Sequence, residues 1–279
     1  MEEAAARFPQ RKAYEDETCS MTFSEVRRLA ASIGTGIAAL ENPGRPVAVF
    51  MEKSVWMAVS LLGVSCGGCI YCPVDVAMPE ARMDRILSVL EPAAVLTSGS
   101  MGARAREACG DCPVLLVEDL AARPADEALL ASLRARIKSS DPLYILFTSG
   151  STGMPKGVVG THQTVLNNLE WLASRFDLGP DDVLGNQAPL HFVVADHDLY
   201  CPLKFGCSSF FIPAGYFSFP AKLIPLLNQH RVTTVFWVPF ALGTIASLRA
   251  LDEILPEFLR YVFFVGEVMP VRQLNYWRA

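Results

Sequence analysis

Apolar residues follow two alternating patterns along the chain, helical spacing and short uninterrupted runs. Between residues 26 and 40 an apolar side chain recurs every three or four positions. This spacing predicts a helix that Thr22 or Ser24 can cap and that Asn42-Pro43-Gly44 ends. Helices are also predicted from Ser54, over 82–90 and after Thr161. Apolar runs that predict buried inner strands lie at 46–50, 93–97, 114–117, 233–238 and 261–265.

Such alternation predicts an α/β fold, with mostly parallel sheets covered by helices and ligand sites at the carboxyl ends of the strands. The charged segment 121–138 is predicted to be a helical surface element. The stretch 56–74 has no charged residue and approaches the length of a membrane span. Its glycines and Pro73 instead predict a helix of about 12 residues followed by a short strand or loop.

The segment 143–157 reads Leu-Tyr-Ile-Leu-Phe-Thr-Ser-Gly-Ser-Thr-Gly-Met-Pro-Lys-Gly, a strand that continues into a loop of glycines and hydroxyls. Glycine lets the backbone turn its N–H groups toward an anion, hydroxyls donate hydrogen bonds, and lysine adds a compact positive charge. These properties suit a polyphosphate, so ATP is the first substrate to consider. The residues expected to bind it are Thr148, Ser149, Gly150, Ser151, Thr152, Gly153, Lys156 and Gly157.

This loop does not have the Walker spacing, which needs a glycine, four residues and then Gly-Lys-Ser/Thr. Lys156 follows Pro155 and precedes Gly157. A solvated glycine and serine turn is the plain alternative, but the number of positions in order favours a phosphate loop.

Four segments resemble, in the same order, motifs of the adenylate-forming (AMP-binding) superfamily. Thr-Ser-Gly-Ser-Thr-Gly-Met-Pro-Lys-Gly is similar to its phosphate-loop signature. Residues 67–75, Gly-Gly-Cys-Ile-Tyr-Cys-Pro-Val-Asp, with Pro79 and Arg82 after them, resemble a motif of nonribosomal peptide synthetase adenylation domains. Residues 21–26 and 264–270 are similar to the family's opening and Gly-Glu segments. The resemblance covers essentially the whole chain and favours the carrier-protein-loading branch, which includes D-alanine ligases.

The resemblance implies two α/β lobes. Residues 46–177 would form a first lobe with the phosphate loop, and residues 1–45 with 178–279 a second lobe with the acyl pocket. The family's barrel, aromatic-Gly-Pro-Thr-Glu motif, ribose-binding aspartate, hinge and C-terminal catalytic lysine would follow Ala279. We therefore expect this chain to be the N-terminal part of a longer enzyme, with no turnover and weak ATP binding at most in isolation.

The implied reaction activates a small carboxylic acid with ATP as an acyl-adenylate. The acyl group then passes to the phosphopantetheine thiol of an acyl or peptidyl carrier protein. Thr148 and Lys156 take the catalytic roles, while the Mg²⁺ ligand is expected beyond Ala279, so no residue of this chain is assigned to metal. The alternative is a non-catalytic nucleotide-binding or carrier-docking remnant of the same fold.

The acid would be selected by residues 189–200, which resemble a Phe-Asp-x-Ser run and align Val193 with its aspartate. In amino-acid-activating relatives that aspartate holds the substrate's α-ammonium, because a buried cation needs an opposite charge. Three explanations stay open: an acid without an α-amine (keto, hydroxy, aryl or fatty), a charge supplied by Asp196, or lost activity. The acyl pocket is assigned by the same resemblance to Phe192, Val193, His197, Phe240, Phe263, Val265 and Gly266, with core packing a close alternative for Phe240.

Composition sets further limits. With 279 residues, 51% of them hydrophobic, and a formal charge of −5, the chain can bury a large core but has no global basic character. Nucleic acid is therefore not expected as a partner. The start, Met-Glu-Glu-Ala-Ala-Ala-Arg, carries acid where a signal peptide or presequence carries basic charge, so a cytoplasmic protein is expected.

The eight cysteines include one group spaced three residues apart and one Cys-x-x-Cys pair, which a zinc or iron–sulfur site would also explain. The first group lies inside a motif already assigned, where cysteine replaces small apolar residues. A metal site is therefore not favoured for these groups. The two groups are Cys66, Cys69 and Cys72, and Cys109 with Cys112. Cys19, Cys201 and Cys207 are interpreted as ordinary thiols in a reducing compartment.

Overall fold

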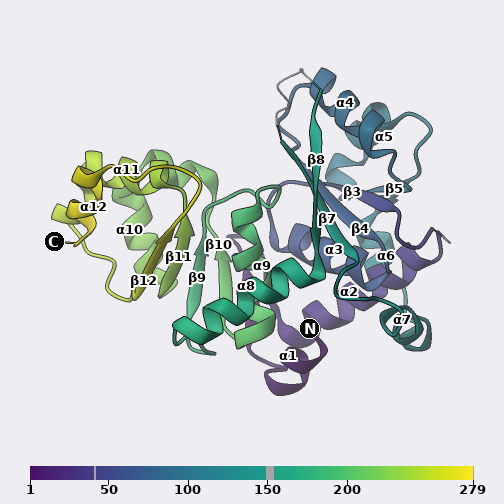
Figure 1. Cartoon of the computed structure of the whole chain (residues 1–279), viewed down its shortest axis with the longest axis horizontal. Helices are drawn as coiled ribbons and strands as arrows, with labels where there is room; N and C mark the ends of the chain where they lie inside the picture. Colours follow the sequence, from purple (N-terminus) through teal and green to yellow (C-terminus); the bar gives the residue numbers. More distant parts are fainter. Residues whose placement is uncertain (41, 149–153, 279) are drawn as a thin grey trace. The chain divides into compact units, whose positions relative to one another are not determined.

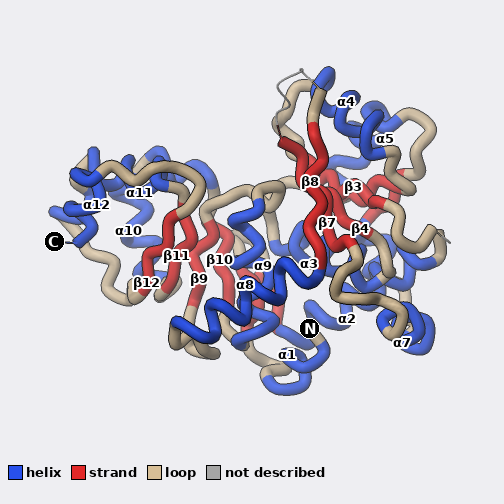
Figure 2. The backbone as a smooth tube through the Cα atoms, in the orientation of Figure 1, coloured by secondary structure: helices blue, strands red, loops and turns tan. Residues whose placement is uncertain are grey.

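The computed structural model describes residues 1–40, 42–148 and 154–278, which form two compact units, each with a six-stranded sheet (Figures 1 and 2). Unit 1 contains Met1–Phe23 and Leu172–Ala279, and unit 2 contains Ser24–Trp171. Both sheets are mostly parallel, which confirms the predicted α/β class. The expected lobe boundaries were 45/46 and 177/178. The units divide earlier in the sequence, because the helix that ends at Ala38 belongs almost wholly to unit 2.

The sheet of unit 1 is parallel except for its last strand, which pairs antiparallel with its neighbour. In sheet order its strands are β12 (Tyr261–Phe264), β11 (Thr234–Trp237), β9 (Val183–Asn186), β10 (Ser208–Phe211), β1 (Lys12–Glu15) and β2 (Ser20–Thr22). The helices are α1 (Glu2–Arg7), α9 (Asp196–Phe205), α10 (Pro220–Gln229), α11 (Pro239–Ser247) and α12 (Val271–Arg278). Short 3-10 turns are η2 (Val193–Ala195), η3 (Ala214–Ser218) and η4 (Ala250–Asp252).

The sheet of unit 2 is likewise parallel except for one edge strand, β8. In sheet order its strands are β6 (Val114–Leu116), β5 (Ala94–Thr97), β3 (Pro46–Phe50), β4 (Ile70–Val74), β7 (Pro142–Thr148) and β8 (Lys156–Thr161). Its helices are α2 (Phe23–Ala38), α3 (Val55–Cys66), α4 (Glu80–Leu90), α5 (Gly102–Cys109), α6 (Val117–Ala121), α7 (Glu127–Arg134) and α8 (His162–Arg175), with a 3-10 turn η1 (Gly99–Met101). The first and last of these helices cross the division between the units.

Hydroxyl side chains cap the first turns of two helices at the positions that the sequence predicts. The Ser54 hydroxyl accepts a hydrogen bond from the backbone N–H of Met57 at 3.2 Å, so it caps α3. The Thr161 hydroxyl accepts from the N–H of Thr164 at 3.2 Å ahead of α8. Each bond satisfies an amide that has no partner within its own helix.

The charged segment 121–138 is mostly exposed, as predicted for a surface element, and its helical part is α7. Helix α6 ends at Ala121, and Pro124 lies in the segment between the two helices. Proline lacks an N–H and disfavours helical backbone in the residue before it. The Asp126 carboxylate then starts α7 by accepting from the N–H of Leu129 at 2.9 Å.

The uncharged stretch 56–74 is divided as predicted. Helix α3 spans 12 residues and strand β4 follows it after Gly67-Gly68. No helix in the described residues has the length and apolar character that crossing a lipid bilayer demands.

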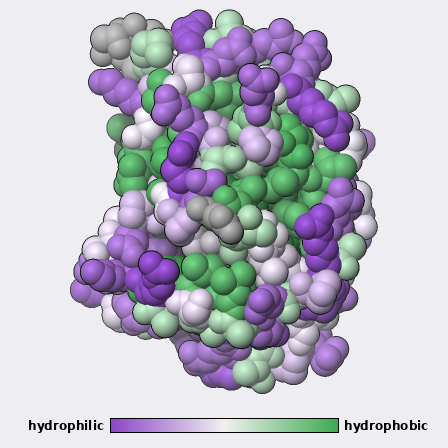
Figure 3. Space-filling view, turned by 90° about the vertical axis from the view of Figure 1, so that its right-hand side faces the viewer, coloured by the Kyte–Doolittle hydropathy of each residue, from purple (hydrophilic) through white to green (hydrophobic). Residues whose placement is uncertain are grey.

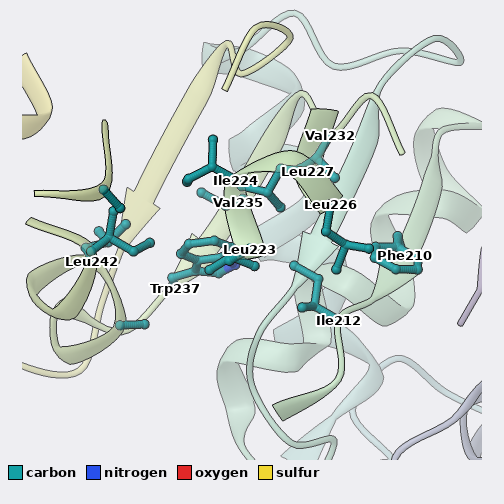
Figure 4. Packing of buried hydrophobic residues seen from close by; sticks show 13 residues of the cluster. Phe210, Ile212, Leu223, Ile224, Leu226, Leu227, Val232, Val235, Trp237 and Leu242 are labelled. Carbon is teal, nitrogen blue, oxygen red and sulfur yellow. The ribbon is translucent and has the colours of Figure 1, made fainter. Parts of the chain in front are cut away.

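In unit 1, a buried apolar cluster fills the space between the sheet and the helices α10 and α11. Figure 4 shows Trp237 of β11 with Leu223 of α10 beside it. The indole is fully buried, and its Nε1–H donates to the carbonyl of Gly185 on β9 at 2.7 Å. A buried indole nitrogen needs such a partner, so this bond fixes the ring while its apolar part fills the core.

Apolar side chains also reach the surface. On the face drawn in Figure 3 they gather in a band bordered by hydrophilic residues. In unit 2 the edge strand β8 exposes Val158 and Val159. Scattered exposed apolar residues are normal for a folded chain, since polar atoms alone cannot cover its surface.

The hairpin of β7 and β8 depends on one glycine. Tyr144 and Gly160 are opposite each other in the antiparallel register, and the Tyr144 ring is almost fully buried. A Cβ atom at Gly160 would lie 2.1 Å from Cζ of that ring. The ring therefore occupies the space that any other side chain would need.

We expect Gly160→Ala to lower the free energy of unfolding by about 1–3 kcal/mol, because the new methyl group displaces a buried ring. Gly179→Ala is the matched control, since a Cβ there meets nothing within 4 Å. The control should leave stability unchanged or slightly raised. Urea titration of both variants gives the comparison, and equal stability for the two would contradict this account.

Candidate functional site

The segment with the glycines and hydroxyls connects the two strands of the β7–β8 hairpin. Thr148 is the last residue of β7 and Lys156 the first of β8, and the two are paired across the hairpin. The expected phosphate-binding residues Ser149, Gly150, Ser151, Thr152 and Gly153 lie outside the described residues. Gly157 follows in β8, opposite Phe147. The pairing of Lys156 with Thr148 was not foreseen, because the sequence shows no alternation that marks β8 as a strand.

The two described ends of this loop carry groups that suit an anion. The Thr148 hydroxyl makes a long contact, 3.5 Å, to the carbonyl of Lys156, and both residues are exposed. Within the described residues, no acidic side chain lies within ion-pair distance of the Lys156 ammonium. Thr148 also ends a strand that is parallel to β4, and this carboxyl edge is where open α/β sheets bind ligands. A donor hydroxyl and an ammonium at such an edge fit a polyphosphate.

In unit 1 the predicted acyl-pocket residues follow the carboxyl ends of three parallel strands. Phe192, Val193 and His197 come after β9, Phe240 after β11, and Val265 and Gly266 directly after β12, of which Phe263 is part. Parallel pairing of β11 with both β9 and β12 brings these ends to the same edge of the sheet.

Phe236, which the sequence analysis did not assign to the pocket, stacks on two of these residues. The His197 ring stacks on Phe236 with centroids 4.2 Å apart, and Phe236 stacks on Phe263 at 4.5 Å. Phe176 closes the row with an edge contact to Phe263 at 4.7 Å. Phe236 lies on β11 next to Trp237, so the two point to opposite faces of the sheet. That alternation was the available signal, because a strand with large aromatics on both faces has a ligand or a second layer to pack against.

His197 sits in this row as a neutral ring. Its Nδ1 lies 2.9 Å from the carbonyl of Val194, which assigns the proton to that nitrogen. Burial lowers the pKa of His197 from its ordinary value, while the bond to Val194 acts in the opposite direction. Desolvation by burial is the larger of the two effects.

Buried hydrogen bonds connect the start of α9 to the strands beside it. The Asn186 side-chain amide donates to the Asp198 carboxylate at 2.7 Å and to the carbonyl of Ala188 at 3.0 Å. Ser209 donates to the backbone carbonyl of Asp198 at 2.6 Å. Asn186 and Asp198 are both fully buried, so these bonds tie the end of β9 to the helix that carries His197. Asp198 is therefore a structural carboxylate, whereas Asp196 is half-buried at the first position of α9.

The segment after β12 turns back toward α11. The Val265 N–H donates to the carbonyl of Trp237 at 3.4 Å, and Gly266 adopts φ of +97°, which favours glycine. The carboxylate of Glu267 then accepts from the backbone N–H of Phe240 at 3.2 Å, in the first turn of α11. An acid at a helix N-terminus satisfies an open amide and complements the helix dipole.

Three other residues of the predicted pocket are largely exposed to solvent. Val193 is 61% exposed, and Phe192, which is 55% exposed, has its ring against His191. Phe240 is 74% exposed, so core packing does not explain it. The structure thus joins His197 and Phe263 through stacked rings, and leaves Phe192, Val193 and Phe240 open to solvent at the same edge.

The described residues contain no group of three His, Cys, Asp or Glu side chains that could hold a metal ion. Cys69 and Cys72 are buried, and burial raises the pKa of the Cys72 thiol to about 12. These thiols behave as small apolar groups in the core of unit 2.

We expect the His197 imidazole to titrate with a midpoint below its ordinary value of 6.5, measured by NMR. Because the unfolded chain binds the proton more readily, His197 favours folding above pH 6.5 and this contribution falls as the pH drops below that value. His197→Gln should remove both the resonance and that part of the pH dependence of stability. A midpoint at or above 6.5 would contradict the enclosed neutral ring.

Known proteins resemble this chain throughout its length. An L-proline–[L-prolyl-carrier protein] ligase of Pseudomonas fluorescens is 28% identical over the whole chain, and one of Streptomyces coelicolor is 30% identical over 91% of it. The chain spans 57% and 51% of those relatives. The nonribosomal peptide synthetase FmoA3, solved with α-methyl-L-serine-AMP, superimposes with a TM-score of 0.87 at 26% identity, over 98% of this chain and 30% of that one. The family profile described as AMP-binding enzyme matches residues 1–279, and the chain belongs to that family.

Proposed function

We propose that the protein activates a carboxylic acid with ATP as an acyl-adenylate for transfer to the thiol of a carrier protein. The observation that carries the proposal is the pairing of Thr148 with Lys156 at either end of the glycine and hydroxyl loop. Family membership and the carrier-protein ligases among the relatives support the same reaction class.

Bound ATP would supply the electrophilic α-phosphorus and pyrophosphate as the leaving group. The task of this chain's residues is to hold the phosphates in place and to offset their charge. The exposed Lys156 ammonium contributes positive charge, and the Thr148 hydroxyl donates a hydrogen bond in place of its long contact to the Lys156 carbonyl. Mg²⁺ would neutralise part of the remaining phosphate charge.

For the acid we propose a substrate that lacks an α-ammonium group. Val193 offers no charge, and one oxygen of the Asp198 carboxylate accepts from Asn186. Asp196, half-buried at the first position of α9, is the carboxylate that would serve an amino acid instead. The rings of His197 and Phe263 stack on the buried Phe236 at this edge, and burial lowers the pKa of His197. An aromatic environment of this kind suits an aryl or other apolar acid better than an amino acid. The prolyl-carrier protein ligases among the relatives make amino acids the competing class.

ATP–pyrophosphate exchange by the intact gene product, with a panel of amino, keto, hydroxy, aryl and fatty acids, tests the reaction. Exchange with at least one acid is expected. A folded, intact protein that exchanges with none of them would instead be a non-catalytic remnant of the fold.

Lys156→Ala should reduce the exchange rate by about 10²-fold or more, since it removes a charge that stabilises the phosphates as they separate. Lys222→Ala, at an exposed site on α10, is the control and should exchange normally. A Lys156→Ala protein with the activity of the control would remove Lys156 from the proposed site.

Val193→Asp should raise the specificity constant for α-amino acids relative to acids without an amine by at least about tenfold, because a carboxylate offsets the burial of an ammonium group. Val193→Asn has nearly the same shape without the charge and should not show the shift. An equal change in both variants, or none in either, would count against the assignment of Val193 to the pocket.

A further inference from the structure

A pair of thiols in unit 2 lines a cavity that the proposed reaction does not use. Cys109 ends α5, and Cys112 stands two residues before β6. Both border a cavity of about 520 Å³, together with Arg45 and Glu91. The cavity lies where the chain enters β5 and β6, at the amino edge of the sheet, whereas Thr148 is at the carboxyl end of β7.

The backbone brings the two cysteines together in a tight turn. The N–H of Cys112 donates to the carbonyl of Cys109 at 3.1 Å, and Gly110 between them has φ of +55°. A turn closed by this bond keeps the first and fourth Cα atoms within about 7 Å. Disulfides bridge Cα atoms about 4.4–6.8 Å apart, so the turn satisfies the main geometric requirement for a bond between the sulfurs.

A second Cys-x-x-Cys pair in the same unit has a different environment. Cys66 ends α3, and the N–H of Cys69 bonds to the carbonyl of Val64 instead of that of Cys66. The thiol of Cys69 is buried and points to the carbonyl of Asn42 at 3.4 Å. The Cys112 thiol also contacts a backbone carbonyl, that of Pro92 at 3.4 Å, and both cysteines of the turn pack against the core cluster of unit 2. The difference is that Cys109 and Cys112 are only partly buried and border the cavity, whereas Cys69 is buried.

We infer that Cys109 and Cys112 form a dithiol site that exchanges with small disulfides of the glutathione type and closes to an intramolecular disulfide. The thiolate of one cysteine attacks the small disulfide, forms a mixed disulfide and expels one small thiolate. The second cysteine's thiolate then attacks the protein-bound sulfur and expels the other. Overall two protein thiols are oxidised to one disulfide, and the small disulfide is reduced to two thiols that carry the two protons.

The cavity has a role in the first step. The attached half of the small disulfide needs room beside the attacked sulfur, and the cavity beside both thiols provides it. The Arg45 side chain at its wall donates to the carbonyl of Glu91 at 2.7 Å, and Arg45 and Glu91 offer both signs of charge to a peptide-like thiol.

The rate of this thiol–disulfide exchange should depend on pH. Desolvation first, and then the neighbouring Cys112 thiol, raise the pKa of Cys109 to about 11, and burial also raises the pKa of Cys112. Because only the thiolate attacks, the rate should rise about tenfold per pH unit while the pH stays well below 11.

The test is the equilibrium constant for closure in glutathione redox buffers, for the whole protein and for a synthetic peptide of residues 107–114. Mass spectrometry of the tryptic peptide that begins at Glu107 counts closed and open pairs, since no other cysteine falls in it. The turn should make the constant at least about tenfold larger in the protein than in the free peptide. A smaller ratio would overturn the inference.

Variants separate the two steps. Cys112→Ser should stop at the mixed disulfide on Cys109, while Cys69→Ser should leave closure unchanged. If Cys112→Ser remains unmodified by oxidised glutathione although iodoacetamide alkylates Cys109, the cavity does not admit the small disulfide and the site is not the one described here.

Discussion

Parallel strand pairing is the constraint on which the rest of this molecule depends. Parallel strands cannot be joined by tight turns, so the chain must cross over each sheet and leave every strand at the same edge. In unit 1 this brings three segments, distant in sequence, to the ends of β9, β11 and β12. In unit 2 it places Thr148 beside the end of β4. The two antiparallel pairs, β1–β2 and β7–β8, stand apart from this rule, and the second connects its strands through the glycine and hydroxyl loop.

The carboxyl edge of the sheet in unit 1 carries both buried, hydrogen-bonded groups and exposed apolar side chains. Asn186, Asp198 and Ser209 form buried hydrogen bonds, each of which would leave an orphaned polar group if one partner were lost. The aromatic rings beside them pack face to face, and burial lowers the pKa of His197. Val193 and Phe240 extend from this framework into solvent. The edge where the acyl pocket is proposed thus combines buried hydrogen-bonded groups with solvent-exposed apolar side chains.

Much of this architecture was predictable from local chemistry. Strand β3 matches the predicted 46–50 in both bounds, and Ser54 and Thr161 begin their helices, because apolar runs and hydroxyl caps act over a few residues. Strand β8 escaped prediction because its first four residues are exposed and show no alternation. Phe236 was missed although its place beside Trp237 puts large aromatics on both faces of β11, because its partners His197 and Phe263 are more than 25 residues away in the sequence. Motif resemblance identified the family, but it could not indicate that Asp198 is committed to Asn186.

The bond from the Trp237 indole to Gly185 has a consequence for the seam between β9 and β11. These strands are in register at Thr234 and Leu184, and Gly185 is the next residue of β9. The indole N–H of Trp237 therefore reaches back from the last residue of β11 to a carbonyl inside β9. One buried side chain thus adds its own cross-strand hydrogen bond to the backbone pairing of this seam.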